Sequence, residues 1–160
     1  MSELIWSESL ELGVERMDST HREFVELFNA LASSPTDRRL EAFDRFIVHT
    51  IEHFDQENRW MEKVGFPGCH KAEHDRVLAV MHEVRKRAEE GDAFLAQRLI
   101  DELAGWFEHH ANSMDAALAY HLEQVGFDFE RECATKNAST SGACGPAGCG
   151  TGSSEDARPA

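Results

Sequence analysis

The sequence has no long hydrophobic run and no excess of positive charge, and each absence excludes a class of protein. No stretch approaches the roughly 18 consecutive apolar residues of a transmembrane helix. The N-terminus is acidic and lacks the basic-then-apolar layout of a signal peptide, which predicts a cytoplasmic protein. The formal net charge is −14, whereas nucleic acids and anionic membranes bind positively charged surfaces. We therefore expect no nucleic-acid partner and no membrane insertion.

Cysteine is scarce where a soft-metal site would need it. The chain has four cysteines, and none clusters on the apolar stripes described below, which argues against an iron–sulfur site. Cys144 and Cys149 are spaced too widely for the usual C-x-x-C signatures, and a structural disulfide is not expected in a cytosolic protein. A flexible thiol pair that senses redox state or captures a soft metal is an alternative to incidental cysteines. Cys69 and Cys133 show no spacing signal.

Composition divides the chain near its C-terminal end. From about Ala134 onward the sequence is rich in Gly, Ser, Ala and Thr and has no apolar periodicity. Such a segment buries too little apolar surface to offset the entropy lost on ordering, so we predict a flexible tail. The predicted organisation is one folded domain over residues 1–130 and a disordered Gly/Ser/Cys-containing tail over residues 131–160.

Within residues 1–130 the apolar side chains recur at helical spacing and no segment alternates like a strand. One helix is predicted over Asp18–Leu31, and a second begins at a cap formed by Thr36 or Asp37 and ends at the Gly-Phe-Pro-Gly sequence of residues 65–68. A third begins near His70 and stops at Gly91. The fourth opens after Asp92 and continues toward Val125, with an inner face of Phe94, Leu95, Leu99, Leu103, Trp106 and His110. These elements predict an all-α fold, an up-down-up-down four-helix bundle with an N-terminal arm and a flexible C-terminal tail.

Ionisable side chains occupy the predicted buried stripes. His70 and His74 are four residues apart, which places two imidazoles one turn apart on the same helix face. His53 and Glu57 repeat this spacing on the preceding helix. Burying so many polar groups is costly unless they are paired or coordinate a metal, so the set predicts a metal site rather than independent core histidines. Its candidate ligands are His21, His53, Glu57, His70, His74, His110 and Asp115.

The number of candidate ligands constrains the metal. Five imidazoles and two carboxylates exceed the four ligands of a tetrahedral zinc, and this donor set suits iron, manganese or a pair of zinc ions. If both carboxylates bridge two octahedral irons, the protein and a bridging oxygen fill about eleven of twelve positions. One position then stays open beside a redox-active pair, which is the requirement for an oxygen-binding site.

Four segments resemble, in order, the ligand-bearing blocks of the hemerythrins, and in particular of bacterial single-domain members. They are Asp18–Phe24 (DSTHREF), His53–Met61 (HFDQENRWM), His70–His74 (HKAEH) and Trp106–Asp115 (WFEHHANSMD). The resemblance extends over residues 1 to about 125. It implies a non-enzymatic protein that binds dioxygen reversibly, for storage, transport or delivery, at two iron ions (Fe²⁺/Fe³⁺) joined by an oxo or hydroxo bridge.

The resemblance also assigns a role to each ligand. It places His70, His74 and His110 on one iron and His21 and His53 on the other, which binds dioxygen, and it makes bridges of Glu57 and Asp115. An apolar pocket must then keep water from the open position. The candidates for its lining are Phe24, Phe54, Trp106 and Leu118, for which ordinary core packing is the alternative.

Two features depart from the family pattern or from regular helix geometry. Most hemerythrins carry a tyrosine one turn before the second-helix histidine, and here that residue is His49. It is a second-shell donor to the site, an additional ligand or a surface residue. His110 and Asp115 are five residues apart, a rotation of about 140° on a regular helix. We therefore predict a π-bulge or break around Ala111–Met114, and we place His82, His109 and His121 on the surface.

Two other functions remain as alternatives at the sequence level. The first is a di-iron enzyme that handles peroxide. Ferritin-like enzymes carry Glu-x-x-His pairs, and no histidine here has a glutamate three residues before it. The second is a sensor of oxygen, nitric oxide or iron. The rate at which an oxygen-bound form is lost separates these alternatives, since a carrier loses it slowly and a sensor or oxidase loses it fast.

Overall fold

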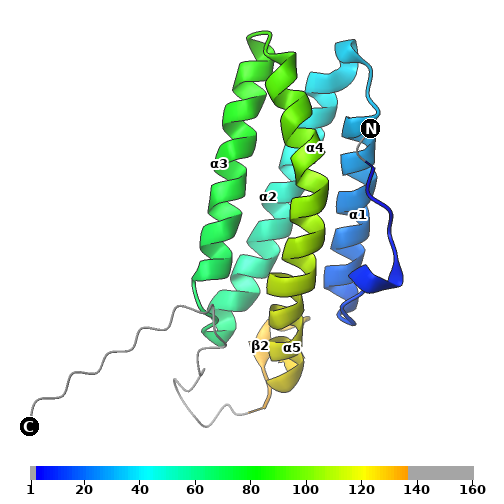
Figure 1. The fold of residues 1–160 in the computed structure, drawn as a ribbon. Helices are drawn as coiled ribbons and strands as arrows, with labels where there is room; N and C mark the ends of the chain where they lie inside the picture. Colours follow the sequence, from blue (N-terminus) through cyan, green and yellow to red (C-terminus); the bar gives the residue numbers. More distant parts are fainter. Residues whose placement is uncertain (1–2, 137–160) are drawn as a thin grey trace, which may run out of the picture.

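Four helical segments pack side by side in the computed structural model, which describes residues 3–136 (Figure 1). They are α1 (Glu15–Ala32), α2 (Arg39–Val64), α3 (Cys69–Glu89) and a last segment made of three pieces. In that segment, α4 (Ala93–His110) continues through a π-helical turn, η3 (Ala111–Asp115), into α5 (Ala116–Gln124). Successive segments run in opposite directions (Figure 1). The predicted up-down-up-down bundle is confirmed.

The helix ends follow the sequence signals closely. Gly65 ends α2 in the left-handed conformation, with φ of 64°, and the Phe66 N–H then donates to the Met61 carbonyl at 2.9 Å. At the start of α4 the Asp92 carboxylate accepts from the Leu95 N–H at 2.9 Å. A short 3₁₀ turn, η2 (Thr36–Arg38), precedes α2, so that helix begins slightly later than predicted.

The N-terminal arm, which includes a 3₁₀ turn, η1 (Glu8–Leu10), is held against α1 by hydrogen bonds to its backbone. The Asp18 carboxylate accepts from the N–H groups of Leu12 and Gly13 at 2.8 and 3.1 Å. Asn29 exchanges two hydrogen bonds with the backbone of Leu4. Asp18 therefore fixes the arm from within α1 and is not the first residue of that helix, which starts at Glu15.

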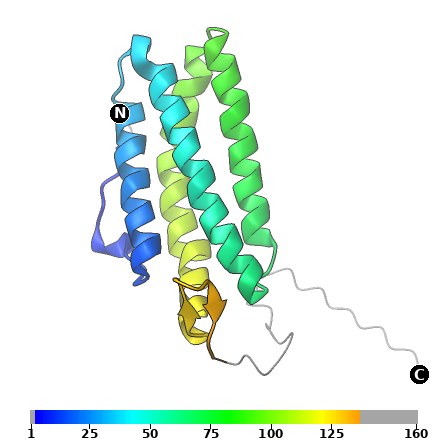
Figure 2. The same cartoon turned by 180° about the vertical axis from the view of Figure 1, so that it is seen from behind.

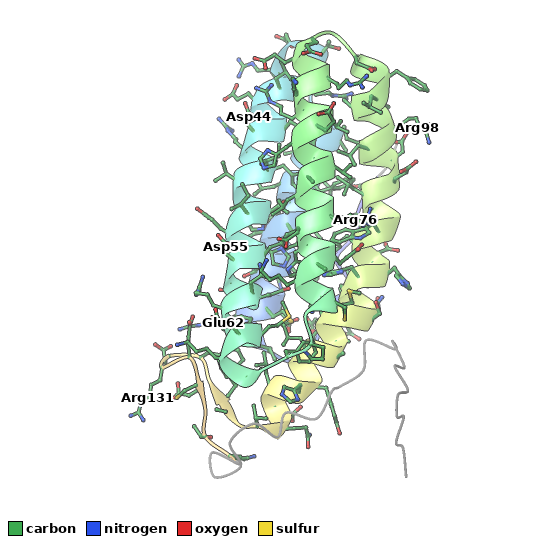
Figure 3. All side chains as sticks on the ribbon, turned by 90° about the vertical axis from the view of Figure 1, so that its left-hand side faces the viewer. Asp44, Asp55, Glu62, Arg76, Arg98 and Arg131 are labelled. Carbon is green, nitrogen blue, oxygen red and sulfur yellow. The ribbon has the colours of Figure 1, made fainter. Side chains whose placement is uncertain are left out.

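A layer of polar side chains separates two apolar clusters in the bundle interior. On α2, Phe54 belongs to the larger cluster and Trp60 to the smaller one, and Glu57 lies between them in sequence. On α1, His21 lies in the same way between Phe24 and Met17. Charged residues such as those labelled in Figure 3 point outward from the helices. Because burying polar groups between two apolar clusters is costly, this layer is the candidate functional site.

The buried stripe of α4 lies about one position away from the predicted one. It consists of Ala96, Ile100, Leu103, Phe107 and His110, whereas Leu95, Leu99 and Trp106 lie half-buried at its border. Phe94 was predicted to point inward, and this prediction is wrong, because its side chain is 74% exposed. It lies two residues before Ala96, a rotation of about 200° that places it on the opposite face.

A small β-hairpin follows the bundle and was not predicted. Its strands, β1 (Phe127–Asp128) and β2 (Cys133–Ala134), pair in antiparallel fashion below the helices (Figure 2). The hairpin packs on α2, since the Phe129 ring lies 5.0 Å from the Trp60 ring. Strands of two residues are too short to show an alternating pattern. Residues 131–136, which the sequence assigned to the tail, therefore include a strand of this hairpin.

Cys69 is disulfide-bonded, which its spacing did not predict, and Cys133 is an exposed free thiol. The predictions for Cys144, Cys149 and the tail from residue 137 onward lie outside the described residues. Within residues 3–136, no helix is long and apolar enough to cross a membrane.

Candidate metal centre

The structure brings all seven predicted ligand residues together in the polar layer. They come from every helical segment, and each is at most 3% exposed. Their ligand atoms form two overlapping groups, in each of which all atoms lie within 4.8 Å of one another. The four-donor half consists of His21, His53, Glu57 and Asp115, and the five-donor half consists of Glu57, His70, His74, His110 and Asp115. The two carboxylates belong to both halves.

Glu57 directs one carboxylate oxygen to each half. Its Oε1 lies 2.9 Å from His53 Nε2 and 3.5 Å from His21 Nε2. Its Oε2 lies 3.4 Å from His74 Nε2 and 3.6 Å from His70 Nε2. A carboxylate placed in this way can donate one oxygen to each of two neighbouring cations.

Asp115 does the same from the opposite side of the bundle. Its Oδ2 lies 3.2 Å from His21 Nε2, while its Oδ1 lies 2.9 Å from His70 Nε2 and 3.1 Å from His110 Nε2. The π-helical turn makes this possible, because its wider turn brings Asp115 back to the face of His110. The predicted π-bulge is confirmed, and it spans Ala111–Asp115.

Three imidazole nitrogens converge in the five-donor half. His110 Nε2 lies 3.2 Å from His70 Nε2 and 3.3 Å from His74 Nε2. Two nitrogens bound at right angles to one metal, each about 2.1 Å from it, lie about 3 Å apart. The observed separations therefore match a shared cation.

Several of these atoms have no hydrogen-bond partner, which tests whether a cation fits. Among the described residues, His21 Nε2, Glu57 Oε2 and both Asp115 oxygens make no hydrogen bond, although they lie close to oppositely polarised atoms. Buried polar atoms in native proteins are normally satisfied. Lone pairs that converge where no N–H or O–H group is directed at them can be satisfied by a metal ion. These side chains therefore fit the bound cations that the sequence predicts.

The electrostatics of the layer also favour positive charge within it. Burial disfavours ionisation of Glu57, and Asp115 adds repulsion, yet the surrounding histidines hold the pKa of Glu57 well below its usual range. Burial also disfavours ionisation of Asp115, but His110, His21 and His70 together hold its pKa well below its usual range. Burial opposes the charge on His21, but the two carboxylates raise its pKa to about 10. Without metal, protons supply part of the positive charge that the carboxylates require.

Residues outside the ligand set fix the orientation of two ligands. Asn58 Oδ1 accepts a hydrogen bond from His74 Nδ1 at 2.9 Å, and the Phe54 ring stacks on the His74 ring at 3.9 Å. The Trp106 ring stacks on His110 at 4.6 Å. The sequence does not mark Asn58 as a site residue, because it lies one residue beyond Glu57 and off the predicted stripe.

The predicted oxygen-pocket residues are distributed around the site, and only some lie at the four-donor half. Phe24 contacts His53 with ring centroids 5.9 Å apart, and Phe54 contacts it at 5.2 Å. Trp106 instead lies against His110, and Leu118 packs in the smaller apolar cluster. Phe107, which was not predicted, stacks on Phe24 at 4.3 Å and contacts His21 at 5.4 Å. Its position three residues before His110 is the sequence signal that could have identified it.

The remaining histidines differ in exposure. His82 and His109 are exposed, as predicted. His121 is half-buried against Phe66, at a ring distance of 5.5 Å, so it is less exposed than a free surface residue. The reason is the Gly65–Gly68 turn, which places Phe66 beside α5. His49 is only 9% exposed, and burial lowers its pKa.

Fold and site together define a four-helix-bundle protein with a buried cluster of histidine, glutamate and aspartate side chains that could hold metal ions. A family model described as the hemerythrin HHE cation-binding domain matches residues 12–122. The chain belongs to the hemerythrin family, whose members are di-iron, oxygen-binding proteins.

Similar proteins come from several bacteria. The chain is 45% identical over 131 residues to a bacteriohemerythrin of Ralstonia nicotianae, an alignment that covers 81% of this chain and 96% of the relative. It is 29% identical over 138 residues to a bacteriohemerythrin of Stenotrophomonas maltophilia, covering 82% and 90%. A bacteriohemerythrin of Methylococcus capsulatus is 28% identical over 104 residues, covering 61% and 79%. The similarity to the first of these extends over nearly the whole relative.

Proposed function

We propose that this protein binds dioxygen reversibly at two iron ions held in the polar layer. The observation that carries the proposal is the unequal number of protein donors in the two halves. Both halves share Glu57 and Asp115, but one adds three histidines and the other adds two. A pair of octahedral ions bound in this way has its open position on the four-donor half.

Each protein group has a distinct task in this proposal. Glu57 and Asp115 would each give one carboxylate oxygen to each of the two ions. His70, His74 and His110 would hold one ion, and His21 and His53 would hold the other with fewer protein donors. The bridged iron pair supplies reversible electron transfer to and from dioxygen when it is bound. Asn58 keeps the His74 proton on Nδ1, so that its Nε2 lone pair faces the site.

The apolar surroundings of the four-donor half protect it from water. The stacked rings of Phe24 and Phe107 cover His21 and His53, and both phenylalanines are 1% exposed. Dioxygen is small and apolar and can enter such a cover, whereas water and charged reductants are disfavoured there. A covered site holding a redox-active pair favours binding over turnover, which supports a carrier and not an enzyme.

An oxygen cycle on iron-loaded, reduced protein tests the proposal. Anaerobic protein is exposed to air and then returned to vacuum, while the optical spectrum and dissolved oxygen are followed. We expect absorption bands that appear in air, disappear under vacuum and reappear over several cycles, with about one dioxygen taken up per iron pair. Bands that never reverse would overturn reversible binding and support a sensor, and consumption of added peroxide would support a peroxide-handling enzyme.

A further inference from the structure

Trp106 connects a candidate iron ligand with the protein surface. Its ring stacks on the His110 ring, with centroids 4.6 Å apart and planes inclined by 20°. It also makes an edge contact at 6.2 Å with Phe54, the ring that stacks on His74. Because the Trp106 side chain is half-buried, it reaches from the five-donor half to solvent.

A hydrogen bond from α3 holds the indole N–H of this ring. Trp106 Nε1 donates to Glu73 Oε1 at 2.8 Å. Glu73 is held in turn by Arg76, whose Nη2 lies 2.6 Å from Oε1 and whose Nε lies 2.9 Å from Oε2. Such a two-pronged pair fixes the carboxylate, and a hydrogen bond to a charged acceptor is stronger than one between neutral groups. The position of the Trp106 ring is therefore set from another helix.

Packing alone does not fix the Trp106 ring. The ring lines a surface cavity of about 100 Å³ between α3 and α4, together with apolar side chains that include Val80 and Leu103. A ring in a close-packed interior has no space to move into, whereas this ring has open space beside it. The hydrogen bond to Glu73 therefore determines whether the ring stays stacked on His110 or turns toward the cavity.

We propose that Glu73 is a positioning residue for the five-donor half, because its hydrogen bond keeps Trp106 against His110 and so keeps the His110 ring in the orientation that binds iron. This inference rests on the proposed di-iron function and adds to it a residue that belongs to neither ligand group. Glu73 acts on His110 through Trp106, much as Asn58 acts on His74.

The hydrogen bond is tested first on metal-free protein, so that this result does not depend on iron. Exchange of the Trp106 indole N–H with deuterated solvent is followed by NMR, and its signal is identified by its absence in Trp106→Phe. We expect severalfold faster exchange in Glu73→Ala than in wild type, because the donor loses its partner. Metal-free Glu73→Ala should melt within about 3 °C of wild type, since a solvent-exposed ion pair contributes little to stability.

The affinity for ferrous iron, measured by competition with a chelator, then tests the effect on the site. We expect Glu73→Ala to weaken binding about tenfold, the lower end of the range for residues that orient a metal ligand, because it acts through Trp106. Glu73→Gln should recover most of the loss, since its amide oxygen can accept the indole N–H. Glu83→Ala is the matched control, because it removes the exposed Arg87–Glu83 ion pair from the same helix, and it should match wild type.

A double-mutant cycle separates positioning from a simple effect of charge. Trp106→Phe keeps an aromatic ring beside His110 but has no N–H that Glu73 can accept. If Glu73 acts through Trp106, then Glu73→Ala should change iron affinity by less than about twofold in the Trp106→Phe background.

Unchanged indole exchange in Glu73→Ala would overturn the proposal, because the hydrogen bond would then not form in solution. Unchanged iron affinity would overturn it as well. An equal loss of affinity in Glu73→Gln, or in the Trp106→Phe background, would replace positioning with a purely electrostatic effect and so overturn it. The proposed function is judged separately, because irreversible oxygen binding would contradict it while the comparison of iron affinities still stands.

Discussion

Asn58 and His74 are joined by a hydrogen bond of 2.9 Å from the imidazole Nδ1 to the amide Oδ1. The bond fixes the tautomer of His74, because the proton that it uses leaves Nε2 free to bind a cation. Among the described residues, the outward Nδ1 atoms of His21, His53 and His70 have no such partner. The orientation of His74 in the five-donor half therefore depends on this hydrogen bond together with the stacked Phe54 ring.

Replacing Asn58 with alanine should weaken metal binding about 10- to 100-fold, as is typical when a partner of a ligand histidine is lost. The affinity of the purified variant for ferrous iron is measured by competition with a chelator. Gln124→Ala, at an exposed amide of α5, should leave the affinity unchanged. Equal affinity in Asn58→Ala and wild type would show that His74 needs no external orientation.

Replacing Glu57 with alanine should remove at least one iron per chain and lower the free energy of unfolding by about 3–5 kcal/mol. The reason is that it leaves buried ligand groups without their bridging carboxylate. Metal analysis and thermal melting measure both effects. Glu62→Ala, at an exposed glutamate of the same helix, should retain two irons and the wild-type melting temperature. A Glu57→Ala protein with full iron content would contradict the bridging geometry.

Replacing Phe107 with alanine should open the cover over the four-donor half. We expect a loss of stability of about 3–5 kcal/mol, because a buried aromatic ring is removed from the core, and faster oxidation of the oxygen-bound form to a non-reversible state. The rate is followed by the decay of the optical bands in air. Phe94→Ala, on the same helix but 74% exposed, should alter neither property. Equal decay rates would mean that the ring only packs.

The position at which the chain is shortened should decide whether stability falls. Ending the chain after Lys136 keeps the hairpin, so with Cys69 reduced in both proteins the melting temperature, iron content and oxygen binding should match the full chain. Ending it after Arg131 removes β2 and the Arg59–Glu132 ion pair, whose atoms lie 3.3 Å apart. That variant should be about 1–3 kcal/mol less stable but should retain iron, because the ligands end at Asp115. Loss of iron from the Lys136 variant would make the tail part of the site.

The helices, and the face of each helix on which its ligand residues lie, could be predicted from local spacing. Pairs such as His70 and His74 lie one turn apart on any α-helix, and the five-residue interval before Asp115 required a distortion that the structure contains. These features depend on helix geometry alone. The bridging orientation of the two carboxylates does not, because it depends on how four helices rotate against one another.

Tertiary packing decided the features that the sequence did not reveal. Phe94 and Phe107 are equally apolar, and only the rotation of α4 in the bundle determines which one is buried. Asn58 acts on a ligand of another helix, 16 residues away. The hairpin depends on a contact between Trp60 and Phe129 that no short-range pattern marks.

The most direct test of the central claim is a titration of metal-free protein with ferrous iron under anaerobic conditions. The bound iron is counted, and magnetic coupling between the ions is measured after oxidation. The shared carboxylates of Glu57 and Asp115 predict two irons per chain, which couple magnetically because they share bridging ligands. A single iron, two uncoupled irons, or a preference for zinc that iron cannot displace would contradict the di-iron centre.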